Sequence, residues 1–130
     1  MKRTSHIISV ITILSVIFSF ITAYAEQADG PETRAEKLVD MMAKKDFSSV
    51  VKNFDATMTN VMPAEKLEQV WDQVTGQAGN FKKQLKTSKE KVQQYEVVHV
   101  TCQFEKARLD VNVVYNKDGK VSGINFAPAR

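Results

Sequence analysis

Few side chains in this sequence combine the type and the spacing that chemistry requires. Beyond residue 25 the chain contains one cysteine, Cys102, and one histidine, His99. A cysteine nucleophile needs a histidine base within hydrogen-bond reach, but a spacing of three along a strand sends the two side chains to opposite faces. One histidine, one cysteine and scattered acids also lack the spacing of metal ligands. The sequence therefore predicts no catalytic residue, no metal site and no cofactor.

Four polar side chains are candidates for acid–base chemistry of the ketosteroid isomerase type, which needs a carboxylate base and hydrogen-bond donors in a dry pocket. Asp55 suits the N-cap of a helical turn, and Asp72 lies roughly 100° round a helix from its apolar stripe. His99 and Asp110 alternate with apolar residues on strands, so both point to solvent if the apolar face is the inner one. We expect structural roles for all four and keep a small enzyme of this class as the alternative.

Aromatic and methionine side chains indicate a different function, the binding of an apolar ligand. They recur in both halves of the chain with periods that turn them toward the space between the helices and the sheet. Methionine side chains are flexible, so they make the wall of a pocket in this space adaptable. This composition favours an apolar or peptide-like ligand over a small charged one. The alternative is that the same side chains only fill a core. The expected pocket is lined by Phe54, Met58, Met62, Trp71, Tyr115 and Phe126.

The first half of the chain has the apolar period of helices. One helix begins at Pro31, and Asp46 is a suitable N-cap for a second, short helix. Asp55 caps a turn, after which Pro63 begins a third helix that Gly76 ends. The buried stripe of the third helix is expected to comprise Leu67, Val70, Trp71 and Val74.

From Phe81 onward the apolar period is two, which predicts strands. The turn signals "EKAR" and "NKDGK" separate the later strands, and lysines protect the first strand as an edge. Three helices followed by this meander predict an α+β fold, in which N-terminal helices pack on a curved four-stranded antiparallel sheet. The expected strands cover residues 81–91, 97–104, 109–115 and 121–127.

The N-terminal segment is typical of a secretory signal peptide. Lys2 and Arg3 precede an uncharged run that ends in Ala23-Tyr24-Ala25, which predicts cleavage after Ala25 and a secreted or periplasmic protein. The alternative is an N-terminal membrane anchor; after cleavage no stable anchor is expected. We expect a signal peptide over residues 1–25, a flexible leader over 26–33 and a single α+β roll domain over 34–130.

Charge and cysteine content exclude further classes. The whole chain carries a formal charge of +3, to which Lys2 and Arg3 contribute two, so residues 26–130 carry +1. This balance lacks the basic face that nucleic-acid binding needs. A single cysteine forms no internal disulfide, so Cys102 is expected to be a buried apolar side chain and the fold to depend on apolar burial.

Several short motifs resemble domain-of-unknown-function family DUF3887, of the cystatin-like and nuclear transport factor 2-like fold class. The matching features run in order through "KDFSSVVKNFDATMTNVMPAEKLEQVWDQVTGQAGNF" and "YEVVHVTCQFEKARLDVNVVYNKDGKVSGINFAP". Such domains occur alone in exported bacterial proteins or ahead of an α/β-hydrolase domain, and the family has no assigned chemistry. This chain has no Gly-x-Ser-x-Gly nucleophile elbow.

The resemblance and the residue patterns together predict an exported, non-catalytic binding or interaction module. Its partner is a small apolar or peptide-like ligand or another protein, and not nucleic acid. An accessory role beside a separately encoded α/β-hydrolase is an alternative. A homodimer through the outer face of the sheet is also compatible with the mixed surface formed by Val97, His99, Thr101 and Val114.

Overall fold

The computed structural model describes residues 29–130, so the expected signal peptide lies outside the described residues. None of the helices within 29–130 is long and apolar enough to cross a membrane. The elements in chain order are α1 (Pro31–Ala43), α2 (Phe47–Val51), α3 (Ala56–Val61), α4 (Ala64–Ala78), β1 (Phe81–Val92), β2 (Tyr95–Phe104), β3 (Arg108–Tyr115) and β4 (Val121–Pro128).

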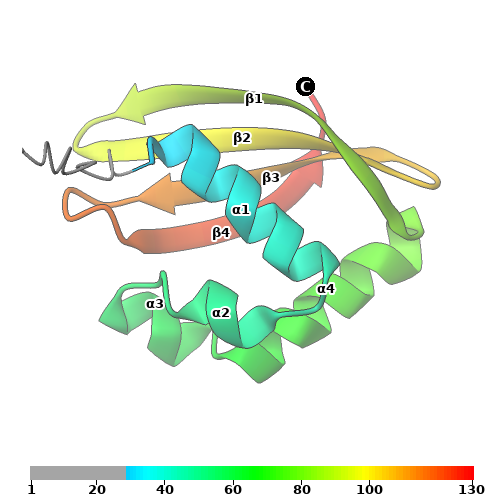
Figure 1. Cartoon of the computed structure of the whole chain (residues 1–130), viewed down its shortest axis with the longest axis horizontal. Coiled ribbons are helices and arrows are strands. Elements are labelled where there is room, and N and C mark those ends of the chain that lie inside the picture. The colour runs from blue at the N-terminus through cyan, green and yellow to red at the C-terminus, as the bar shows by residue number, and fades with distance from the viewer. Residues whose placement is uncertain (1–28) are drawn as a thin grey trace, which may run out of the picture.

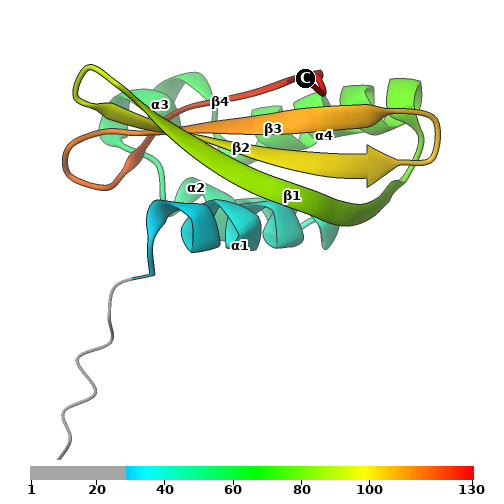
Figure 2. The same cartoon turned by 90° about the horizontal axis from the view of Figure 1, so that it is seen from above.

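The fold is α+β, with the helices packed against one antiparallel sheet of four strands in the order β1-β2-β3-β4. Figure 1 shows α1 lying across the sheet, with α2, α3 and α4 along its β4 side. The view from above shows that the sheet is twisted, because β1 and β4 run at an angle to each other and cross in this view (Figure 2). This arrangement confirms the expected helices on a four-stranded antiparallel sheet.

The core lies between the helices and one face of the sheet. Alternation along β2 and β3 places Val98, Val100 and Cys102 on this face together with their pairing neighbours Val111 and Val113, all fully buried. Burial of Cys102 is therefore confirmed. The stripe of α1 that covers this face consists of Ala35, Leu38, Val39 and Met42.

Helices α3 and α4 differ from the expectation. The turn after Asp55 is a complete short helix, α3, because the Asp55 carboxylate accepts a hydrogen bond of 2.7 Å from the Met58 N–H and caps it. Helix α4 does not end at Gly76 but continues to Ala78, whose burial outweighs the propensity cost of an internal glycine. Gly79 ends this helix with φ of 81° and ψ of −175°, a conformation open essentially to glycine alone.

Helix α1 begins at Pro31, as expected, and this start shortens the leader expected over residues 26–33. Pro31 is the first residue of the helix, where its fixed φ is favourable and its missing N–H costs nothing. Residues 31–33 are therefore helical and do not belong to a flexible leader.

Candidate functional site

The six side chains expected to line a pocket do not surround one hollow. Four of them, Phe54, Met58, Trp71 and Tyr115, belong to the buried core. Met62 and Phe126 are partly buried and pack against it, and the Trp71 ring lies 6.0 Å from that of Phe126. Phe126 and Tyr115 each line a hollow, but at different places. Ligand binding by the six as a set stays a prediction.

An apolar groove runs between α4 and the last strand. It has a volume of about 300 Å³ beside the C-terminal part of α4 and continues into a section of about 320 Å³. The two sections share Val74, Gln77 and Phe126. The first section is further lined by Ala78, Ala107, Leu109, Ala127 and Pro128.

The groove lies beside the open edge of β4. The Ala129 N–H donates to the Arg108 carbonyl at 3.1 Å, which fixes the alternation of backbone groups along the antiparallel pair. Every second residue before Ala129 directs its N–H and C=O groups toward β3. The N–H and C=O groups of Phe126 and Ile124, which lie between these residues, therefore point away from β3. Within residues 29–130 these edge groups make no backbone hydrogen bond outside the sheet.

The two edges of the sheet differ in protection. β1 carries five lysines, whereas β4 contains no charged residue. Charged side chains on an edge strand are a common barrier to pairing with another chain. Only the start of β4 is covered, where Val121 exchanges hydrogen bonds of 2.8 Å with Asn53 and Asp55. The remaining length of the β4 edge is unprotected by charge and borders an apolar groove.

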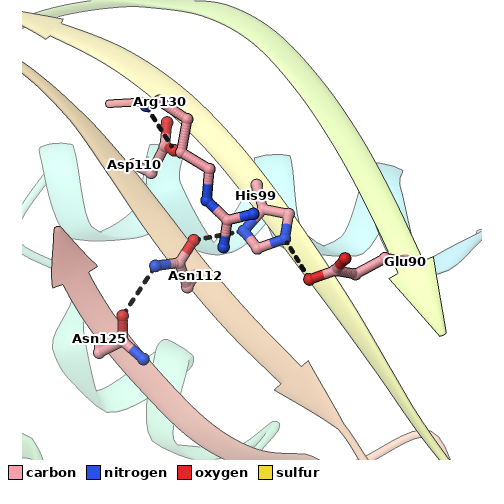
Figure 3. Close-up of polar contacts among 6 residues, drawn as sticks. All are labelled: Glu90, His99, Asp110, Asn112, Asn125 and Arg130. Carbon is pink, nitrogen blue, oxygen red and sulfur yellow. Dashed lines mark hydrogen bonds and ion pairs between the residues drawn. The ribbon is translucent and has the colours of Figure 1, made fainter. Parts of the chain in front are cut away.

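A row of polar side chains crosses the face of the sheet that the helices do not cover (Figure 3). The row consists of Glu90, His99, Asn112 and Asn125. His99 Nδ1 lies 2.6 Å from Asn112 Oδ1, and the Asn112 amide donates to Asn125 at 2.8 Å. His99 Nε2 lies 3.1 Å from a Glu90 carboxylate oxygen. Acceptors therefore face both ring nitrogens, and the ring makes both hydrogen bonds only when both nitrogens carry protons.

The expectation that Asp110 points to open solvent is wrong, although it lies on the outer face as predicted. Asp110 is only 4% exposed. Its carboxylate accepts hydrogen bonds from the Thr101 hydroxyl at 2.6 Å and from the Arg130 backbone N–H at 3.4 Å. Figure 3 shows Arg130 beside Asp110 on this face. Arg130 thus contributes to covering a carboxylate that strand alternation alone would leave exposed.

The remaining acid–base candidates have structural positions. Asp55 caps α3, as expected, and Asp72 is exposed on α4. His99 and Cys102 lie on opposite faces of β2 and cannot form a nucleophile–base pair. Burial raises the pKa of the Cys102 thiol to about 12, so this thiol stays protonated at neutral pH.

Within residues 29–130, no cluster of three or more His, Cys, Asp or Glu side chains is placed to hold a metal ion. Sequence reasoning missed the groove because its lining residues read as ordinary apolar positions of α4 and the strands. The absence of charge in β4, set against the lysines of β1, is the signal that could have indicated it.

Comparison with known proteins identifies the family of the chain. The family model described as "Protein of unknown function (DUF3887)" matches residues 35–124. No curated protein and no solved structure matches.

Proposed function

Because the chain belongs to the DUF3887 family, whose description assigns no activity, we propose its function from the α4–β4 groove. The domain is a binding module that takes an extended, apolar segment of a partner polypeptide. The segment adds to the edge of β4 as a further strand and places alternate side chains in the groove. No turnover of the bound segment is involved.

The open edge of β4 beside the groove is the observation that carries this proposal. Strand addition needs unpaired backbone groups for affinity and hollows for alternate side chains for selectivity. Ile124 and Phe126 supply the backbone groups, and both also line the groove. Gln73 and Gln77 are the polar side chains that α4 contributes, so the groove favours neutral segments over charged ones.

We expect a proline at position 124 to separate strand addition from ordinary apolar binding. Ile124→Pro removes the outward backbone N–H. Ile124→Ala is the matched control, because it shortens the side chain but keeps the backbone N–H. The probe is a capped hexapeptide of alternating valine and threonine. Its binding is measured by the fluorescence of Trp71, whose ring lies 6.0 Å from that of Phe126. Loss of one backbone hydrogen bond should weaken binding about tenfold in Ile124→Pro relative to Ile124→Ala.

Circular dichroism should show both variants folded, since proline is tolerated on an edge strand where the N–H faces outward. Equal affinity of the two variants would show that the peptide does not pair with β4. The absence of a saturable fluorescence change in the wild-type protein would reject the groove as a peptide site.

Export is part of the same proposal, because a binding module with this N-terminal segment would act outside the cytoplasm. The Ala23-Tyr24-Ala25 pattern follows an apolar run of signal-peptide length. We expect the intact mass of the exported protein to correspond to a chain that begins at Glu26. A mass that retains residues 1–25, recovered in a membrane fraction, would establish the anchor instead.

A further inference from the structure

A second hollow lies at the end of the sheet that carries the β1–β2 and β3–β4 turns. Figure 1 and Figure 2 both show these two turns at the same end as the start of α1. The hollow has a volume of about 450 Å³, and charged and polar groups dominate its lining. The lining residues are Arg34, Lys91, Gln94, Glu96, Tyr115, Asn116, Lys117 and Gly119.

The charges of this hollow are not balanced. Arg34, Lys91 and Lys117 bring three positive charges, and Glu96 brings a single negative one. The ion pairs within residues 29–130 are Lys37–Asp29, Lys89–Glu32 and His99–Glu90. No carboxylate in that part of the chain therefore lies within ion-pair distance of the three cations. Guanidinium groups that are partly buried are ordinarily paired with an anion.

Arg34 and Tyr115 leave two donors unused at this place. One terminal nitrogen of Arg34 donates to the Gly119 carbonyl at 2.6 Å, and the guanidinium carbon lies 4.5 Å from the centre of the Tyr115 ring. Arg34 Nε and the Tyr115 hydroxyl are both buried, and neither has a hydrogen-bond partner among residues 29–130. Buried polar atoms of native proteins are nearly always hydrogen-bonded, so two unused donors on adjacent side chains require an explanation.

We infer that this hollow binds an oxyanion, a carboxylate or phosphate group carried by a small organic molecule. The guanidinium of Arg34 supplies a planar fork of donors that suits such a group, and the two lysines add point charges. The Tyr115 hydroxyl supplies a neutral donor when the partly exposed Arg34 side chain shifts on the ring to admit the anion. Burial raises the pKa of Tyr115 to about 12, so the hydroxyl keeps its proton at neutral pH. This inference is independent of the α4–β4 groove, which has no lining residue in common with the hollow.

The test uses inorganic phosphate and succinate as probes, with amide chemical shifts of the purified protein as the measurement. We expect saturable shifts centred on Lys91, Tyr115 and Gly119 for at least one probe. Arg34→Gln should weaken that binding about tenfold, because a charge-assisted donor pair is lost. Preference for phosphate or for succinate distinguishes the two kinds of oxyanion.

Two further variants make the outcome decisive. Tyr115→Phe keeps the ring and removes only the hydroxyl, so it should weaken binding severalfold and leave the free protein as stable as before, since no hydrogen bond is lost. Lys83→Gln, on a β1 position whose residue does not line the hollow, should leave binding unchanged. The inference is overturned if neither probe gives saturable shifts, if Lys83→Gln weakens binding as much as Arg34→Gln, or if Tyr115→Phe binds both probes like the wild type.

Discussion

Replacement of Trp71 by alanine is expected to lower the free energy of unfolding by about 3 to 5 kcal/mol. Trp71 is almost fully buried and packs α4 against phenylalanine rings of the sheet. Its ring lies 5.8 Å from Phe104, 6.0 Å from Phe126 and 6.3 Å from Phe81. Truncation therefore opens a cavity among three aromatic rings that rigid strands hold apart. A loss of this size is a large share of the stability of a small domain.

Denaturant unfolding followed by far-ultraviolet circular dichroism measures the effect, since the variant has no tryptophan left. Val61→Ala is a suitable control, because Val61 is 56% exposed on α3 and its truncation should change stability by no more than about 0.5 kcal/mol. An unchanged unfolding midpoint for Trp71→Ala would mean that α4 does not pack on the sheet through this residue.

Gly79→Ala is expected to cost about 3 kcal/mol, from backbone strain and steric overlap together. The φ of 81° at Gly79 is unfavourable for any residue with a Cβ, and an added Cβ would lie 2.6 Å from the Cβ of Glu105. The clash cannot relax cheaply. The Glu105 N–H donates to the Asn80 carbonyl at 3.0 Å, and the Lys106 N–H donates to the Ala78 carbonyl at 2.8 Å.

Gly76→Ala is a matched control that should change the stability in the opposite direction. Gly76 lies within α4, and a Cβ there would meet no atom within 4 Å. Gly76→Ala should therefore stabilise the protein by about 0.5 to 1 kcal/mol through helix propensity. Thermal unfolding of the two variants in parallel measures both effects, and a loss of stability in Gly76→Ala as large as that in Gly79→Ala would contradict the steric argument.

Local signals in the sequence were sufficient for most of the fold. Alternation of apolar residues located β2 and β3, and the capping roles of Asp46 and Asp55 followed from their positions before helical runs. These signals work because each depends on neighbours within a few residues. The end of α4 was misplaced because glycine propensity at Gly76 is a weak local preference, which burial of Ala78 overrides.

The candidate sites depend on contacts that sequence patterns do not encode. Arg34 and Tyr115 meet although they lie in the first helix and the third strand, and no periodicity links them. Asp110 is covered through Arg130, a residue at the chain end that alternation along β3 cannot indicate. The six residues expected to line the apolar pocket are apolar or aromatic, as a pocket requires, but four of them are buried in the close-packed core, which their spacing in the sequence does not indicate.

The unequal edges of the sheet also limit how copies of this protein can polymerise. A filament built by edge-to-edge pairing needs two receptive edges on each copy, one at either side of the sheet. β4 is receptive, but the five lysines of β1 make that edge a poor acceptor. Two copies that joined through β4 would present only lysine-rich edges outward, and these repel one another. Edge-to-edge association would therefore stop at a dimer, and the β1 lysines would prevent the formation of fibres.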